Sequence, residues 1–350
     1  MLAAESKVAR PDSSGPRGEN SISSWKQIVE HLEPFLQSVN QCLIQQAREF
    51  DPQVVPYAEH ALNGSGKHMR PTLVALAASS AGKIMDAHVT AAVIIEMVHL
   101  ATLVHDDVMD EAEIRRGKLT LAANWGNEIA VLFGDCLFAQ ALKLAASFPT
   151  PEVCRAVAMA TNTVCTGEIL QTQNRRNFEL SRKEYFRVIE MKTAELFTLS
   201  CDLAAFLGNA KPEQRAALRE FGAAFGTAYQ VYDDCVDLFG SESAAGKSLG
   251  TDLAKGKLTW PVLLAWERAN AGDRLHLEGL IQEWQPKNLG GVNELLVKYE
   301  TFKPSLDVIA KYLEQARGAL RVLPETDGRA GLFKLADFLA QQTGALAVCM

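Results

Sequence analysis

The chain has 350 residues, enough to bury a large apolar core within one or two domains. Hydrophobic residues make up 48% and aromatic residues 7%, as in ordinary globular proteins, and the net charge of −7 argues against a general nucleic-acid-binding or anionic-membrane-binding surface. We find no apolar run that approaches the ~20 residues of a transmembrane segment, and no secretory signal. Seven scattered cysteines without CxxC spacing favour reduced thiols and a cytoplasmic location.

Residues 1–21 are rich in serine, proline, glycine and charge, so we predict a disordered tail followed by a single helical domain over residues 22–350. Ser24 is a candidate N-cap for the first helix. Apolar residues then recur at helical spacing almost to the C-terminus. The pattern predicts further helices near residues 71–81, 87–109, 120–147, 151–173, 182–207, 213–239, 257–269, 273–285, 290–299, 304–318 and 329–347. Strand-like alternation is nearly absent, so the predicted fold is all-α: one large antiparallel bundle around a central cavity, without a sheet.

The most informative stretch is His99–Thr120, in which an apolar helical run ends in Asp106, Asp107 and Asp110. A helix turns about 100° per residue, so Asp106 and Asp110 share one face and Asp107 points to the side. Three acids this close raise one another's pKa unless a cation lies between them. Their oxygens suit Mg²⁺ that bridges to substrate phosphates. A solvated acidic helix end is the alternative, although the apolar residues leading into the cluster argue against it.

A second cluster repeats this spacing: Asp233, Asp234 and Asp237 end another apolar helical run. Two such clusters on otherwise apolar helices make chance improbable. If they face each other, they would hold several Mg²⁺ ions and a polyphosphate between them.

Basic residues lie near both clusters. Lys67 and Arg70 stand before a helix that begins at Pro71, where backbone N–H groups and the helix dipole also favour anions. The stretch lacks the Gly-x₄-Gly-Lys-Ser/Thr spacing of a nucleotide-binding loop. Its alternative interpretation is a basic surface turn.

Arg115 and Arg116 follow the first acidic cluster within one loop. Paired arginines can grip phosphate oxygens bidentately, and the adjoining metal site favours that role. The alternative is a salt bridge to Glu111 or Glu113.

His99 lies two turns before Asp106 on the same helix face, which makes contact with a ligand about as plausible as a buried structural role. We assign no direct role to the neighbouring Glu96 and His105.

Further polar features interrupt apolar helices. Gly167 lies inside a predicted helix four residues before Gln171, and an internal glycine often marks close packing or ligand approach. Lys192 and Thr193 break an apolar helix face, and a buried lysine must be paired. Gln230 precedes the second cluster by three residues.

Lys247 and Lys257 stand in glycine-rich segments that follow the second cluster. They could reach back toward an acidic, metal-loaded site. Composition alone would make a flexible surface loop the likelier interpretation.

In this order the motifs resemble those of the trans-isoprenyl diphosphate synthases, the polyprenyl synthetase family, of the long-chain type. The family carries a GKxxRP loop, an HxxxxxHDDxxD helix, an RRG loop, a GExxQ helix, a KT pair, a QxxDDxxD helix and a GK…GTD…GK segment. All are found between Gly66 and Lys257. The helical pattern extends the likeness from about residue 22 to residue 347.

The resemblance implies roles for individual residues. The matches to its catalytic set are Asp106, Asp107, Asp110, Asp233, Asp234 and Lys192. The matches to its Mg²⁺ ligands, which would also accept Mn²⁺, are Asp106, Asp110 and Asp233. The matches to its allylic diphosphate-binding residues are Arg115, Lys192, Thr193, Gln230, Lys247 and Lys257. The matches to its isopentenyl diphosphate-binding residues are Lys67, Arg70, His99 and Arg116. A homodimer is expected on the same ground.

The implied reaction is head-to-tail prenyl transfer from an allylic diphosphate primer to isopentenyl diphosphate. Mg²⁺ and basic side chains would neutralise the leaving diphosphate, so that the allylic C–O bond ionises. The isopentenyl double bond would attack the cation, and a proton would then pass to the released diphosphate, or to a backbone or Thr oxygen near Lys192 and Thr193.

Product length depends on the residues below the metal site. Ala101 and Thr102 are small where farnesyl-making and many geranylgeranyl-making relatives place aromatic rings. We therefore expect a product longer than geranylgeranyl diphosphate, and expect Ala101→Phe to shorten it. Leu132, Phe133 and Val164 are candidates for the floor of the cavity.

Competing readings differ in testable features. A short-chain synthase would share every core motif. A class I terpene cyclase would replace the second aspartate cluster with an Asn/Ser/Glu metal motif, and a non-catalytic synthase subunit would usually lose aspartates. Two departures do not touch the core motifs: the basic C-terminal tail of some members is missing, and Asn174 stands where farnesyl-making relatives carry an aspartate.

Overall fold

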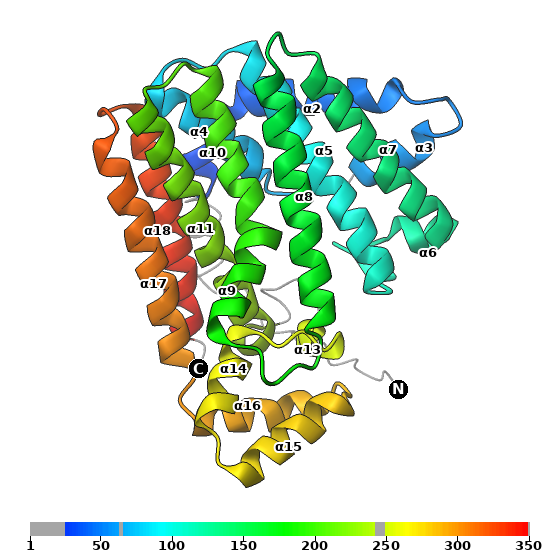
Figure 1. Ribbon diagram of the computed structural model, residues 1–350, viewed down its shortest axis with the longest axis vertical. Coiled ribbons are helices and arrows are strands. Elements are labelled where there is room, and N and C mark those ends of the chain that lie inside the picture. Colours follow the sequence, from blue (N-terminus) through cyan, green and yellow to red (C-terminus); the bar gives the residue numbers. More distant parts are fainter. Residues whose placement is uncertain (1–24, 63–65, 242–248, 349–350) are drawn as a thin grey trace, which may run out of the picture.

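The computed structural model describes residues 25–62, 66–241 and 249–348, with side chains up to residue 346. The predicted tail over residues 1–21, the candidate N-cap Ser24 and the candidate phosphate ligand Lys247 lie outside the described residues. The described chain is helical almost throughout (Figure 1), which confirms the all-α prediction.

The bundle begins with helical residues 25–29 and a 3₁₀ turn, η1 (Glu30–Leu32). The remaining helices of the first half are α2 (Glu33–Arg48), α3 (Val55–Leu62), α4 (Met69–Ala81), α5 (Asp86–Met109), α6 (Leu121–Trp125), α7 (Asn127–Ala146) and α8 (Pro151–Gln173). Those of the second half are α9 (Arg182–Ile189), the π-helical turn η2 (Glu190–Ala194), α10 (Glu195–Leu207), α11 (Pro212–Phe239), α13 (Thr251–Ala254), α14 (Trp260–Arg268), α15 (Ala271–Gln282), α16 (Asn288–Lys298), α17 (Phe302–Ala319), the 3₁₀ turn η3 (Leu320–Val322) and α18 (Asp327–Val348).

Helix α5 lies at the centre of the bundle and contacts α2, α4, α7 and α10 (Figure 1). Its residues Ala91, Val93, Ile94 and Ile95 are fully buried. A helix packed on several sides must be apolar around most of its surface. Both α5 and α7 are long and apolar enough to cross a membrane by length and composition alone, contrary to our expectation that no stretch would be. Packing inside the bundle accounts for the composition of α5.

The predicted helix over residues 182–207 is continuous but contains the π-helical turn η2. Two glycines allow neighbouring helices to approach this wider turn. A Cβ on Gly167 of α8 would lie 2.7 Å from the backbone nitrogen of Lys192, and a Cβ on Gly226 of α11 would lie 2.7 Å from the Cα of Ala194. Gly167 therefore marks close packing, one of the two roles expected for it. Isolated π-helical turns inside α-helices are often found at functional sites.

The loop after α5 forms a short antiparallel hairpin, β1 (Ile114–Arg115) and β2 (Lys118–Leu119), where we predicted no sheet. The two residues between the strands, Arg116 and Gly117, have φ values of 51° and 76°. Positive φ at both positions is the geometry of a tight hairpin turn. Strands of two residues are too short to produce an alternating pattern in the sequence.

Helix boundaries otherwise fall within three residues of the predicted ones, with one break. The predicted helix over residues 120–147 is divided at Gly126, whose φ of 89° ends α6 and redirects the chain into α7. Thr120 caps α6 by accepting a hydrogen bond from the backbone N–H of Ala123.

Candidate active site

One cavity of about 1100 Å³ lies between α4, α5, α7, α8, η2, α10 and α11. It brings together most of the residues that the sequence singled out. The predicted site residues that line it are Lys67, Arg70, His99, Thr102, Asp106, Arg115, Arg116, Lys192, Thr193, Gln230, Asp233 and Lys257. Four other predicted residues do not line it: Ala101, Asp107, Asp110 and Asp234.

Asp106 faces this cavity from the end of α5. Burial raises its pKa to about 6, and the neighbouring Glu168 and Asp110 push in the same direction, while Lys192 and Lys257 oppose them. The Lys192 Nζ atom lies 3.8 Å from Asp106 Oδ2. A bound cation would favour the ionised carboxylate further.

Asp107 points away from the cavity and is only 5% exposed. Its Oδ1 accepts a hydrogen bond of 2.7 Å from the Nε of Arg115, so the alternative salt bridges of this arginine to Glu111 or Glu113 are not formed. Burial raises the pKa of Asp107, and Arg115 partly offsets that effect. Asp107 therefore orients an arginine whose side chain reaches the cavity, rather than facing the cavity itself.

Asp110 ends α5 and joins three segments of the chain. Its Oδ1 is 3.0 Å from the Nη2 of Arg175, and its Oδ2 is 2.7 Å from the Nζ of Lys257. Arg175 follows the end of α8, and the backbone N–H of its neighbour Arg176 donates to the carbonyl of Gly256. We did not identify Arg175 from the sequence. The only signal was its position in a basic pair just after the GExxQ helix.

In the second cluster, Asp233 lines the cavity while Asp234 is buried behind it. Asp234 accepts hydrogen bonds from the hydroxyl of Tyr185, from the Nε2 of Gln230 at 2.9 Å and from the backbone N–H of Trp260 at 3.3 Å. Burial raises the pKa of Asp234 to about 7, although the bonds from Tyr185 and Gln230 lower it. Asp234 thus belongs to the wall of the site.

Asp237 is fully buried and holds the segment that follows the second cluster. The hydroxyl of Thr251 donates to its Oδ1 at 2.7 Å, and the backbone N–H of Asp252 donates to its Oδ2 at 3.1 Å. Both donors lie at the start of α13. This aspartate positions the chain that leads to Lys257.

Lys192 and Thr193 are adjacent in the π-helical turn, and both line the cavity. Lys192 forms an ion pair with Glu168 and donates a hydrogen bond of 2.8 Å to the Oε1 of Gln171. The requirement that a buried lysine be paired is therefore met by the GExxQ helix. Glu168 was part of that motif but had received no role.

A second basic group lies at the start of α4. The Arg70 guanidinium lies 4.9 Å from the centre of the Phe197 ring, and Lys67 Nζ lies 5.6 Å from the centre of the Phe338 ring. Burial holds the pKa of His99 well below its usual value, and the positive charges of Arg70 and Arg116 lower it further. A neutral imidazole beside these cations can still donate one hydrogen bond to an anion.

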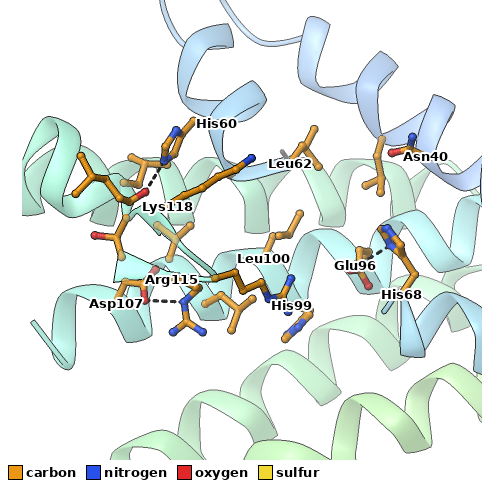
Figure 2. Close-up of a pocket in the computed structure, with 18 residues that line it drawn as sticks. Asn40, His60, Leu62, His68, Glu96, His99, Leu100, Asp107, Arg115 and Lys118 are labelled. Atoms are coloured by element: carbon orange, nitrogen blue, oxygen red, sulfur yellow. Dashed lines mark hydrogen bonds and ion pairs between the residues drawn. The ribbon is translucent and has the colours of Figure 1, made fainter. Parts of the chain in front are cut away.

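A side pocket of about 100 Å³ adjoins the cavity along α5 (Figure 2). Figure 2 shows Asp107 directed toward Arg115, and Glu96 directed toward His68. The Nδ1 of His68 lies 3.8 Å from Glu96 Oε1. The pocket shares His68, Glu96, His99, Leu103, Arg115 and Arg116 with the main cavity, so the two are parts of one site. Glu96, like His105, lines the main cavity although the sequence analysis gave it no direct role.

The apolar part of the cavity differs from the predicted floor. Thr102 and Val164 line it, whereas Ala101 is fully buried in the core. Phe133 packs among other aromatic rings, and Leu132 is 61% exposed, so these two floor assignments are wrong. A periodicity of 3.6 residues leaves the direction of a single side chain uncertain where a helix is buried on several sides. The apolar lining comprises Leu103, Val108, Met109, Val131, Phe138, Val164, Ile169, Ile189, Leu196, Phe197 and Val236.

The acidic residues fit a metal ion that is shared with a substrate. Among the residues that the structure describes, no three His, Cys, Asp or Glu side chains converge as a closed metal site. Mg²⁺ keeps several waters and binds through one or two carboxylates together with substrate phosphates. Carboxylates near the ends of α5 and α11, of which Asp106 and Asp233 line the cavity, supply that kind of partial coordination.

The bundle has a large cavity that contains acidic helix ends and two groups of cations. This combination is typical of enzymes that bind diphosphate esters. The family model for polyprenyl synthetases matches residues 52–298, more than half of the chain. The chain belongs to this family and is a prenyltransferase.

Individual relatives cover nearly the whole chain. The octaprenyl diphosphate synthase of Haemophilus influenzae is 33% identical over 319 residues, which are 91% of this chain and 97% of that protein. A crystal structure of a decaprenyl diphosphate synthase from Rhodobacter capsulatus has a TM-score of 0.86 and 32% identity, covering 91% of this chain and 99% of that one. The polyprenyl synthase from Caulobacter crescentus CB15, solved with calcium and isoprenyl diphosphate, has a TM-score of 0.85 and 33% identity, covering 90% of this chain and 97% of that one.

Proposed function

We propose that the chain is a long-chain trans-polyprenyl diphosphate synthase, which adds isopentenyl diphosphate head-to-tail to an allylic diphosphate. The observation that carries this proposal is the presence of two cationic groups in one cavity. One group, at the start of α4, includes Lys67 and Arg70, and the other, beside the acids of the first cluster, includes Lys192 and Lys257. A reaction between two diphosphate esters requires two such groups.

Each group has a distinct task in this proposal. Asp106, Asp110 and Asp233 would hold Mg²⁺, for which Mn²⁺ can substitute. When bound, Mg²⁺ supplies positive charge that stabilises the departing diphosphate. Lys192 and Lys257 donate to oxygens of the same diphosphate, so that its growing negative charge meets fixed cations.

The isopentenyl diphosphate is held by the remaining cations. Lys67, Arg70 and Arg116 bind its phosphates, and the neutral His99 donates a hydrogen bond to them. Binding at a fixed place converts the meeting of the two substrates into a step within one complex. The proton lost after the new carbon–carbon bond forms passes to the departing diphosphate.

The calcium and isoprenyl diphosphate in the Caulobacter crescentus structure support the metal and substrate assignments by analogy. The test is to incubate the purified protein with radiolabelled isopentenyl diphosphate and farnesyl diphosphate, with Mg²⁺ or with excess chelator. We expect Mg²⁺-dependent extension to a polyprenyl diphosphate. Cyclic products without incorporated label would favour a terpene cyclase, and full activity in chelator would contradict the metal role.

We propose a product longer than geranylgeranyl diphosphate because Thr102, one turn below Asp106, leaves the first part of the cavity open. Thr102→Phe should shorten the product, as measured by mass spectrometry. Ala101→Phe would overpack the core instead, since Ala101 is fully buried. Thr90→Phe is the matched control, because it makes the same change on α5 but does not line the cavity. A wild-type product of farnesyl length would favour the short-chain alternative.

We also propose that the protein is a cytoplasmic homodimer. Outside the cavity, helices α7 and α8 expose large apolar side chains: Leu132 is 61% exposed, Leu142 37% and Met159 65%. An apolar surface of this kind usually marks an interaction site. Light scattering should give twice the chain mass, and Leu132→Asp should reduce it to the monomer mass. A monomeric wild-type protein would contradict the proposal.

A further inference from the structure

A chain of hydrogen bonds runs from helix α9 to the cavity. The hydroxyl of Tyr185 donates to Asp234 Oδ2, the Nε2 of Gln230 donates to Asp234 Oδ1 at 2.9 Å, and the hydroxyl of Thr193 donates to the Oε1 of Gln230 at 2.8 Å. Tyr185 is 4% and Asp234 3% exposed. Of the four side chains, only Gln230 and Thr193 line the cavity. The chain therefore links two residues that cannot touch a substrate with two that can.

The direction of every bond in this chain follows from its buried end. Both oxygens of Asp234 accept hydrogen bonds, one from the hydroxyl of Tyr185 and the other from the NH₂ group of Gln230. The carbonyl oxygen of Gln230 then faces Thr193, and a carbonyl only accepts. The single hydroxyl proton of Thr193 is thereby committed to Gln230. With its proton donated to Gln230, the Thr193 oxygen can act only as an acceptor toward the cavity that it lines.

We propose that Tyr185 is a positioning residue that, through Asp234 and Gln230, keeps the Thr193 oxygen as an acceptor toward the reacting allylic carbon. The inference rests on the proposed prenyl transfer. In that reaction the allylic C–O bond breaks and its electron pair leaves with the diphosphate, so positive charge develops on the allylic fragment. A lone pair held toward that charge stabilises it, whereas a hydroxyl proton in the same place would oppose it. No bond to Thr193 forms or breaks.

The phenol hydroxyl fixes this arrangement because it holds Asp234 from the side opposite to Gln230. The other donor to the same oxygen, the backbone N–H of Trp260, is 3.3 Å away. Without the Tyr185 hydroxyl, the carboxylate loses one of the donors that set its orientation and can rotate away from Gln230. The Gln230 amide is then held less firmly, and its carbonyl no longer keeps the proton of the Thr193 hydroxyl away from the cavity.

The first test is Tyr185→Phe, which removes one oxygen and keeps the ring. We expect kcat to fall about tenfold while the KM values for both diphosphates stay at wild-type values, since other residues bind the phosphates. Tyr312→Phe is the matched control: its ring packs 5.7 Å from Phe186, the same ring that Tyr185 contacts, and it should keep wild-type kcat. Equal rises in both KM values without a change in kcat would overturn the proposal.

The second test is a double-mutant cycle. Thr193→Val removes the acceptor, so adding Tyr185→Phe should change kcat no further, while in Thr193→Ser, which keeps the oxygen, the tenfold effect should persist. Full additivity with Thr193→Val would show that Tyr185 acts elsewhere. If Tyr185→Phe does not fold, Asp234→Asn replaces it in the cycle, because Asp234 is the second residue of the same hydrogen-bond chain. A wild-type protein that makes no prenyl product would instead refute the proposed function.

Discussion

The two aspartate clusters have the same spacing in sequence but are neutralised in different ways. In the first, cations from other parts of the chain approach the acids: Lys192 lies 3.8 Å from Asp106, and Arg175 and Lys257 bind Asp110. In the second, Asp234 and Asp237 accept hydrogen bonds from hydroxyl, amide and backbone N–H groups.

Acids of the first cluster can therefore exchange their lysine and arginine partners for a metal ion, whereas Asp234 and Asp237 stabilise the fold. Lysine and arginine side chains bind phosphate as well as carboxylate. When a substrate arrives with its metal ion, its diphosphate can bind these cations while the metal ion binds the acids of the first cluster. Buried hydrogen bonds to neutral donors offer no such exchange, because breaking them leaves polar groups unsatisfied. Asp106 alone of the first cluster and Asp233 alone of the second line the cavity. One sequence pattern therefore places one acid at the cavity in each cluster, but the other acids bind cationic side chains in the first cluster and accept hydrogen bonds from neutral groups in the second.

The largest expected effect comes from Asp106. Asp106→Ala should lower kcat by about 10³-fold, because it removes a metal ligand where charge develops in the reaction. The fold should persist, since the side chain is at the cavity surface. Steady-state kinetics, with circular dichroism as the folding control, measure both. Asp233→Ala should behave in the same way, and a variant of either residue with near-wild-type kcat would remove the proposed metal site.

The next largest effect is a loss of protein stability when a buried acid of the second cluster is removed. Asp237→Ala leaves the Thr251 hydroxyl and the N–H of Asp252 without their acceptor in a buried place. We expect the free energy of unfolding to fall by roughly 2–4 kcal/mol, measured by urea denaturation. Asp106→Ala, measured in the same way, should change it far less. Equal losses of stability would erase the distinction between the clusters.

A smaller effect separates the two cationic groups. Lys67→Ala and Arg70→Ala should raise KM about tenfold for isopentenyl diphosphate, and Lys192→Ala should raise it for the allylic substrate, because each lost cation removes a charge-assisted hydrogen bond. Initial-rate kinetics with each substrate varied in turn would show the split. If every variant raised both KM values alike, the two groups would not correspond to two substrates.

Much of this architecture is predictable because it is local in the sequence. Helical spacing predicted the helix boundaries. The i, i+4 relation separated Asp106, which lines the cavity, from Asp107, which does not, but it also placed Asp110 on the face of Asp106, and Asp110 does not line the cavity. The partners of the acids were not predictable in the same way. Arg175 meets Asp110 from 65 residues away, and Tyr185 meets Asp234 from 49 residues away, so only the packing of helices reveals them.

Two other errors have a physical origin in backbone geometry. The π-helical turn around Lys192 has the composition of an ordinary helix, and its traces in the sequence were the internal glycines Gly167 and Gly226 that make room for it. The choice between Ala101 and Thr102 depended on a rotation of about 100° per residue in a helix buried on several sides. An apolar pattern all around such a helix does not say which side borders the cavity.

The last prediction concerns the dependence of metal binding on pH. The pKa of Asp106 is raised to about 6, so the carboxyl is protonated below that pH and cannot bind a cation. Affinity for Mn²⁺ with inorganic diphosphate, measured by calorimetry, should be constant above pH 7 and fall below pH 6, by up to about tenfold per pH unit. Because Lys192 lowers the pKa of Asp106, Lys192→Met should move the onset of this fall to higher pH. Asp106→Asn should weaken metal binding and reduce its pH dependence in this range. If the onset is unchanged in Lys192→Met, Lys192 does not stabilise the ionised form of Asp106. Stabilisation by a cationic side chain is the feature that distinguishes the first cluster from the second.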